Sequence, residues 1–264
     1  MPNVAVTAYD LTGNLTKVVL PYTVTAPSRM WPDATNTGVP AGTVLTNSSG
    51  LLNITVAGTV IEARNHSGGI VVNAPNVTIK RSRIRSTSPF VLIQNNSTEL
   101  LIIDCEIDGM NSNTNGISPR NVLVRRCNIH HVENGLNVGG PTIVEDSYIH
   151  DLFSGNGGHS DGAQFNQGAS DITFRHNNIF GGNTATIIMW DGSGSQNANV
   201  LIENNRLDGT ASSYTIYTPR TGPLTNVRIR NNRFVRAAFG YNGGNQSLVT
   251  EWSGNVNDVT GAPV

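Results

Sequence analysis

Apolar and polar residues alternate in a nine-residue pattern that recurs along most of this chain. In each copy the second and fourth positions are almost all apolar. Alternation with a period of two is typical of a strand that buries one face. The starts of the copies are 20 to 30 residues apart. The seven copies lie at residues 76–84, 99–107, 121–129, 141–149, 171–179, 199–207 and 226–234.

A second short strand precedes several copies and begins just after a glycine, as at Gly69, Gly116, Gly135 and Gly162. No segment has an apolar period of 3.6 residues together with helix caps. Short strands that repeat every 20 to 30 residues, with little helix, are typical of a solenoid in which each repeat adds one rung. The sequence therefore predicts an all-β fold, a single-stranded right-handed parallel β-helix, over residues 51–240.

Stacking the copies column by column predicts the role of each position. The second and fourth positions line the core. The fifth position alternates in charge over the last five copies, which predicts ion pairs between rungs about 4.8 Å apart; these residues are Arg125, Glu145, Arg175, Glu203 and Arg230. The seventh position holds small residues and then asparagines, which predicts an inward ladder at a bend; its members are Ser82, Cys105, Cys127, Ser147, Asn177, Asn205 and Asn232.

The same columns give an interpretation of the cysteines and of two histidines. Cys105 and Cys127 are neighbours in the inward ladder, and we interpret them as buried thiols rather than a disulfide, although rung spacing alone does not exclude the bond. His130 and His150 fall in one outward column with Asp108. We expect them to be solvated residues of the wall.

Both ends depart from the repeat. Residues 1–50 contain two strand-like stretches, 3–10 and 16–24, followed by a stretch rich in Pro, Gly and Thr. Because a solenoid needs a cover over the open end of its core, we interpret this segment as a small β cap, with an attachment or trimerisation element as the alternative. Residues 241–264 are interpreted as a carboxy-terminal cap or tail, in which Trp252 covers the last rung.

The composition limits the partners. Charged residues make up 13 % of the chain and the formal net charge is −1, so we expect neither nucleic acid nor an anionic membrane as partner. No apolar run approaches the roughly 18 residues of a membrane span. The first residues lack the basic and apolar regions of a secretory leader. A protein that works inside a cell, one whose leader was removed, and a virion protein released by lysis all fit, and we expect a virion or extracellular location.

The loops between copies lengthen after residue 149, and functional residues concentrate on loops held by a rigid scaffold. Aligning the short strands by their small residues predicts one outward face shared by adjacent rungs. That face offers flat rings for sugar rings, and amides and carboxylates for sugar hydroxyls. Its members are His159, Asp161, Gln164, Trp190, Asp191, Tyr217 and Arg220, with Asn137 and Asn166 in the same columns.

The rungs, over roughly residues 55–240, resemble the pectate-lyase and polygalacturonase superfamily of right-handed β-helices. The segment 159-HSDGAQ-164 is similar to the (H/N)-x-D-G-(I/A)-(Q/D) element of its sugar-processing members, which include lyase-like, phage tailspike-like and minor-tail-like chains. The resemblance implies catalytic roles for His159, Asp161, Asp191 and Arg220. The aligned outward columns predict substrate-binding roles for Asn137, Gln164, Asn166, Trp190 and Tyr217.

The chain also departs from these families. Polygalacturonase-like members carry a double aspartate one rung after that element, where this chain offers only Asp191, and their Gly-His-Gly and Arg-Ile-Lys elements have no clear match. Lyase-like members hold calcium in a carboxylate cluster and use Arg or Lys as base, which Asp161, Asp191 and Arg220 imitate only weakly. We therefore expect no cofactor and assign no metal ligands, with calcium as a weak alternative. Elimination and hydrolysis both stay open.

Three functions fit these observations. The first is a phage tail-associated protein, of the minor-tail or receptor-binding type, that binds a host cell-surface polysaccharide, with cleavage left open. As a homotrimer, it would contact other virion tail proteins through its amino-terminal segment. The second is a secreted bacterial polysaccharide lyase or glycoside hydrolase. The third is a purely structural virion solenoid.

Overall fold

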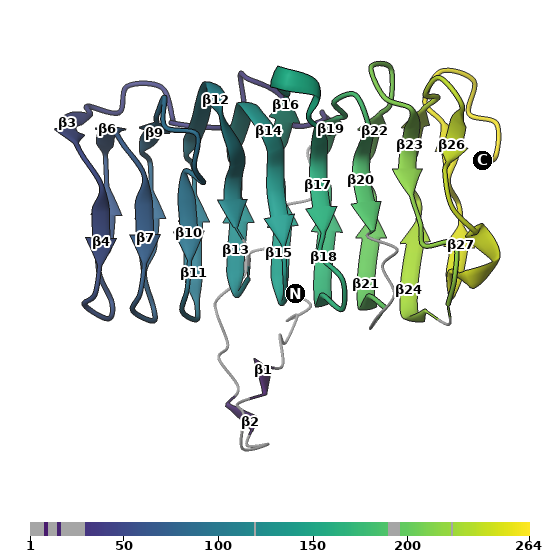
Figure 1. The fold of residues 1–264 in the computed structure, drawn as a ribbon, viewed down its shortest axis with the longest axis horizontal. Helices are drawn as coiled ribbons and strands as arrows, with labels where there is room; N and C mark the ends of the chain where they lie inside the picture. The colour runs from purple at the N-terminus through teal and green to yellow at the C-terminus, as the bar shows by residue number, and fades with distance from the viewer. Residues whose placement is uncertain (1–7, 10–14, 17–29, 119, 190–195, 223) are drawn as a thin grey trace. The chain divides into compact units, whose positions relative to one another are not determined.

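The computed structural model describes residues 8–9, 15–16, 30–118, 120–189, 196–222 and 224–264. The chain divides into two compact units, Met1–Met30 and Trp31–Val264. In the first unit, β1 (Ala8–Tyr9) pairs antiparallel with β2 (Leu15–Thr16). The second unit is a solenoid of stacked rungs, each with short strands on three faces (Figure 1).

The first face is a nine-stranded parallel sheet. It consists of β5 (Val60–Glu62), β8 (Thr78–Lys80), β11 (Leu100–Ile103), β13 (Val122–Arg125), β15 (Thr142–Glu145), β18 (Ser170–Arg175), β21 (Ala198–Glu203), β24 (Thr225–Arg230) and β27 (Glu251–Ser253). The second face consists of β3 (Thr46–Ser49), β6 (Arg64–Ser67), β9 (Arg83–Arg85), the start of β12 (Glu106–Ser118), the start of β14 (Asn128–Val138), β16 (Tyr148–His150), β19 (Asn178–Phe180), β22 (Arg206–Asp208), β25 (Arg233–Val235) and β28 (Val256–Asn257).

The third face is also parallel. It consists of β4 (Leu52–Ile54), β7 (Ile70–Val72), β10 (Ile93–Asn95), the ends of β12 and β14, β17 (Asp161–Phe165), β20 (Ala185–Met189), β23 (Tyr214–Tyr217) and β26 (Gly240–Asn242). Two short 3-10 helices, Gly155–Gly157 and Gln246–Leu248, lie in loops. The predicted all-β parallel β-helix is confirmed.

The core register follows the alternating pattern of the sequence. Ile102 lies between Ile79 and Val124 in the parallel register, and Val144 follows Val124. All four side chains are fully buried. Similar side chains therefore stack on one another along the solenoid axis, and these stacks fill the interior between the faces.

The inward ladder at the bend between the first and second faces is confirmed. From Cys127 onward, the N–H of a ladder residue donates to the side chain one rung further: Cys127 to Ser147 Oγ at 3.1 Å, Ser147 to Asn177 Oδ1 at 3.0 Å, and Asn177 to Asn205 Oδ1 at 2.9 Å. Asn205 continues to Asn232, and Asn232 to Asn255, which the nine-residue pattern had not included. The two cysteines are free and buried, as interpreted.

Three neighbouring pairs of alternating charges on the first face form ion pairs, as predicted. Arg175 contacts Glu145 at 2.7 Å, and Arg125 approaches the same carboxylate at 3.8 Å. Arg230 contacts Glu203 at 3.0 Å. These half-exposed pairs are worth little individually, and they hold the register of neighbouring rungs more than they stabilise the fold.

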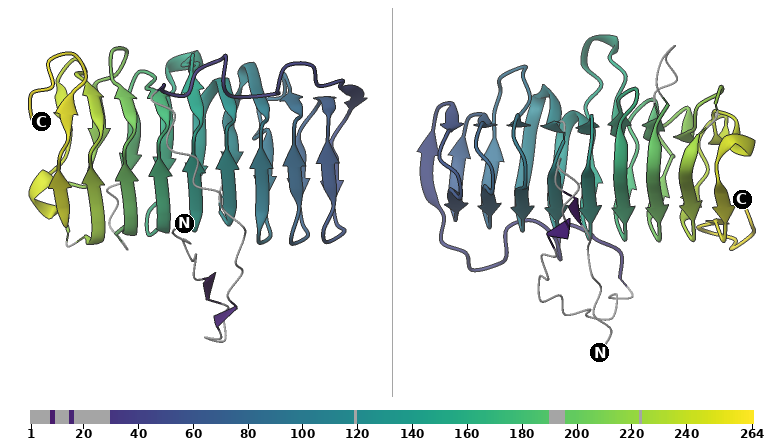
Figure 2. Two further views of the ribbon diagram at one scale, coloured as in Figure 1. Left: turned by 180° about the vertical axis from the view of Figure 1, so that it is seen from behind. Right: turned by 90° about the horizontal axis from the view of Figure 1, so that it is seen from below.

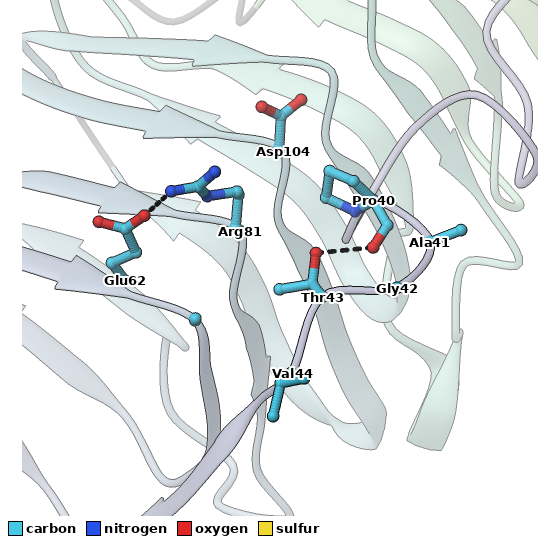
Figure 3. Close-up of a pocket in the computed structure, with 9 residues that line it drawn as sticks. Pro40, Ala41, Gly42, Thr43, Val44, Glu62, Arg81 and Asp104 are labelled. Carbon is cyan, nitrogen blue, oxygen red and sulfur yellow. Dashed lines mark hydrogen bonds and ion pairs between the residues drawn. The ribbon is translucent and has the colours of Figure 1, made fainter.

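Residues 31–45 form a strap along the edge between the first and second faces (Figure 2). The ring of Trp31 stacks on His176 with centroids 5.6 Å apart, and Gly38 N–H donates to the Arg126 carbonyl at 2.9 Å. Further along, Thr43 Oγ1 donates to the Pro40 carbonyl beside a hollow that contains the Glu62–Arg81 ion pair (Figure 3). The strap therefore runs along the solenoid axis and contacts several successive rungs.

The two ends of the solenoid differ. β3 pairs with β6, so the solenoid begins within the segment that the sequence pattern assigned to the cap. At this end Leu51, Val56 and Val60 are exposed. At the other end β27 and β28 add a rung, where Trp252 lies over the core, as expected, with its indole N–H bonded to the Val264 carbonyl at 2.7 Å.

Candidate functional site

The outward column predicted on the third face is confirmed in its register. Asn137 pairs with Gln164, Gln164 with Ile188, and Ile188 with Tyr217. All four side chains are half-buried and alternate with fully buried core residues on the same strands. Because the strands are parallel and adjacent, these side chains form one row along the axis, spaced at about 4.8 Å per rung.

Amide side chains dominate this wall. Asn137 and Asn166 exchange two hydrogen bonds, of 3.2 and 2.8 Å. Nearer the amino-terminal end, Asn73 donates to Asn53 at 2.7 Å and receives from Asn96 at 2.9 Å. These amides are solvent-accessible, so each keeps donors and acceptors free for a ligand.

Aromatic rings gather at the carboxy-terminal end of the same wall. Tyr217 contacts Tyr214 edge to face, with centroids 5.0 Å apart, and Tyr214 contacts the exposed Phe239 at 5.8 Å. Burial raises the pKa of Tyr217, while the charge of the exposed Arg220 acts in the opposite direction. The structure therefore brings two predicted site residues, Tyr217 and Arg220, within electrostatic reach of each other.

Asp161 does not share this outer face, which corrects the prediction. It begins β17 on the same side of the strand as the buried Ala163 and Phe165, opposite to Gln164, and its side chain is 2 % exposed. Its neighbours in the register are Asn134 and Ala185. The alternation of a strand places every second residue inward, and Asp161 has the inward parity.

The carboxyl group of Asp161 is buried and only partly hydrogen-bonded. Its Oδ1 has no hydrogen-bond partner among the described residues. Burial raises its pKa to about 7, although a backbone hydrogen bond from Ala185 lowers it; the charge of Glu133 raises it further. The group therefore titrates close to neutral pH, which is typical of both strained structural carboxyls and catalytic acids.

His159 and Glu133 lie near this carboxyl. His159 is exposed, and its Nδ1 is 3.2 Å from Thr184 Oγ1. Burial raises the pKa of Glu133, against the charge of His159. The repeat gave no signal for Glu133, because it lies at the bend within β14, where the nine-residue pattern has ended. Trp190 and Asp191 lie outside the described residues.

His130 and His150 are not solvated, which corrects the second interpretation. His130 is 9 % exposed, and its ring lies 5.2 Å from that of His150. Tyr148 stacks on His150 with centroids 3.9 Å apart. Within the described part of the chain, one group of metal-ligand type has its ligand atoms within 4.8 Å of one another, and it consists of Asp108, His130 and His131.

Comparison with protein-family models, curated proteins and solved structures finds no match for this chain. The pectate-lyase-like resemblance therefore remains a prediction about family, whereas the parallel β-helix is observed directly. No helix in the described residues has the length and apolar character to span a membrane.

Proposed function

We propose that this chain binds an extended polysaccharide along the outer wall of the third face. The observation that carries the proposal is one outward row on four consecutive strands, in a single register: Asn137, Gln164, Ile188 and Tyr217. A polymer of repeated sugars fits a wall of repeated rungs, since both present similar groups at regular intervals. Amides bond hydroxyls, and the cluster around Tyr217 provides apolar ring faces.

The proposed setting is a phage tail, with the solenoid as the receptor-binding part and the amino-terminal unit as the contact to other tail proteins. The division of the chain after Met30 supports this setting, because it separates a short segment from the solenoid. As a homotrimer, the purified protein would give a light-scattering mass of three times 28.1 kDa. A mass of one chain would contradict the trimer but leave the glycan site in place.

The binding test uses purified full-length chain and a panel of neutral and uronate-containing bacterial polysaccharides in affinity electrophoresis. Gln164→Ala and Tyr217→Ala are each expected to weaken binding about tenfold, a loss of about 1.4 kcal/mol. Thr173→Ala, a half-buried outward position on the first face, is the matched control and should bind as wild type. Equal retention of all four proteins, or no retention of wild type, would reject this wall as the site.

The geometry does not favour cleavage of the bound glycan by Asp161, because its side chain is 2 % exposed and faces the core rather than the outer wall. A general acid must lie within hydrogen-bond reach of the bond that is cleaved, so we expect binding without Asp161-dependent cleavage. The assay follows new reducing ends and unsaturated products, with Asp161→Asn as the variant. Equal activity of wild type and variant removes Asp161 from the mechanism, and no products from wild type leaves binding alone.

A further inference from the structure

We propose that Asp108, His130 and His131 bind one divalent transition-metal ion, with Zn²⁺ as the reference ion. The three residues lie where the second face bends toward the third, on the adjacent strands β12 and β14. This site is separate from the proposed glycan wall and does not depend on it.

The distances between the three ligand atoms suit one shared ion. His130 Nδ1 is 2.8 Å from His131 Nδ1, and Asp108 Oδ1 is 3.1 Å from His131 Nδ1 and 3.6 Å from His130 Nδ1. Zinc bonds to nitrogen and oxygen are about 2.0–2.2 Å long, which places ligand atoms about 3.0–3.5 Å apart around the ion. The observed triangle brackets that range.

The close contacts favour a shared cation. A neutral imidazole nitrogen is either one donor or one acceptor. Without an ion, a single proton on His131 Nδ1 would have to serve both Asp108 Oδ1 at 3.1 Å and His130 Nδ1 at 2.8 Å. A cation at the centre accepts a lone pair from all three atoms.

The backbone explains how two consecutive histidines reach one point. Neighbouring residues of a strand normally point to opposite sides. His131, however, has a φ of +54°, and its N–H donates to the Asp151 carbonyl at 2.9 Å, so the chain turns after His130. Asp108 joins them because it pairs with His130 in the parallel register. The same left-handed conformation recurs at other bends of the solenoid, as at Arg126 and Asp146, so it belongs to the bend and fixes where the ring of His131 lies.

The surroundings of His130 match those of a metal ligand. Its second ring nitrogen, Nε2, faces Glu106 Oε1 at 3.8 Å, and Glu106 is held by Arg83 at 2.9 Å. A carboxylate behind a ligating histidine orients the ring and raises its basicity. His150 packs against His130 but is no ligand itself, because Asp151 and Asn128 lie 2.7 and 2.8 Å from its two ring nitrogens.

The ligand set selects the class of ion. Two imidazoles and one carboxylate suit Zn²⁺, Co²⁺, Ni²⁺ or Fe²⁺, whereas Ca²⁺ and Mg²⁺ prefer oxygen ligands alone. Because the side chain of His131 is 41 % exposed, the ion has access from solvent. Three protein ligands leave at least one coordination position for water or a ligand oxygen.

The test is calorimetric titration of Zn²⁺ into full-length protein from which any affinity tag has been removed, with Co²⁺ absorption spectra as second readout. Wild type is expected to bind one equivalent with a micromolar or lower Kd. His131→Ala and Asp108→Asn should weaken binding at least 100-fold, and Glu106→Gln by about 10- to 100-fold.

His176→Ala is the matched control. His176 forms a similar pair with Asp146 at 2.8 Å elsewhere on the solenoid, so this variant should bind Zn²⁺ as wild type does. Circular dichroism spectra identical to wild type establish that each variant is folded. Failure of wild type to bind at about 100 µM Zn²⁺, or binding by folded His131→Ala and Asp108→Asn with unchanged Kd, would overturn the proposal.

Discussion

At the bend between the first and second faces, each rung from Asn177 onward has one buried asparagine whose side-chain amide bonds to backbone groups. Asn205 Oδ1 receives the N–H of Asn177 at 2.9 Å, and its Nδ2 donates to the Phe174 carbonyl at 2.9 Å. Both backbone groups are turned away from the sheet ladders by the bend. A side chain with a donor and an acceptor on one planar group is what such a position requires.

Replacing this amide should be costly. Asn205→Ala leaves a buried N–H and a buried carbonyl without partners, so we expect the free energy of unfolding to fall by about 2–4 kcal/mol. Asn96→Ala, in the exposed amide stack of the third face, is the control and should change it by less than about 0.5 kcal/mol. Urea unfolding followed by circular dichroism measures both. Similar losses in the two variants would mean that burial does not determine how much these amides contribute to the free energy of unfolding.

The Asp161 carboxyl makes stability depend on pH in an unusual direction. Its pKa is about 7 when folded, against an ordinary value of 3.8, so the folded state binds a proton that the unfolded state has released. Stability should therefore fall as the pH rises from about 4 to about 7. Asp161→Asn removes this penalty. We expect the variant to gain on wild type by about 4 kcal/mol at pH 8 and by less than about 1 kcal/mol at pH 4.

Urea unfolding of both proteins across that pH range measures the difference. Parallel pH profiles for wild type and Asp161→Asn would contradict the raised pKa. A variant that is less stable than wild type throughout would instead show that Asn cannot replace the bond from Ala185.

At the scale of elements, the strap is held where it touches the rungs. Gly38 has a φ of +81°, and a Cβ added there would lie 3.1 Å from Asn128 Cβ. Gly42 has nearly the same φ, +80°, but nothing within 4 Å. Substituting the two glycines by alanine therefore distinguishes the free-energy cost of a left-handed backbone from the cost of steric crowding.

Gly42→Ala should lower the free energy of unfolding by about 1 kcal/mol, the usual cost of a left-handed alanine. Gly38→Ala should cost more, by about a further 1 kcal/mol, because the strap must move off Asn128. Thermal unfolding and limited proteolysis of the strap measure this. Equal losses in both variants would show that the strap is not tightly packed against β14.

The elements that could be predicted from sequence are those set by repetition. The core columns, the Asn205 ladder and the Arg175–Glu145 pair follow from a strand period of two and a fixed rung spacing, so one register determines all of them. The inward position of Asp161 was missed because Gly162 was taken as the start of the strand. The convergence of His130 and His131 depends on one backbone angle at a bend, which the alternation of strands does not encode.

At the scale of the whole molecule, stacked rungs contact mainly their neighbours, so the stability of the solenoid is close to a sum over adjacent pairs. The contributions of the adjacent pairs differ along the axis. The ladder contains serine and cysteine from Ser82 to Ser147, but four consecutive asparagines from Asn177 to Asn255. The side-chain amides of Asn205 and Asn232 each accept a hydrogen bond from a backbone N–H of the preceding rung and donate one to a backbone carbonyl of that rung. A cysteine thiol, in contrast, is a weak donor.

That gradient predicts that the amino-terminal half of the solenoid opens more readily than the carboxy-terminal half. Local opening should begin at the rungs of Cys105 and Cys127, and amides from Asn177 onward should open only with global unfolding. Hydrogen exchange read by mass spectrometry is expected to show protection that rises toward the carboxy-terminal rungs. Uniform protection would mean that the rungs open as one unit. If the gradient holds, the rungs around Tyr217 stay folded in a partly opened molecule. A ligand bound at Tyr217 would then remain bound while the rungs before it are open.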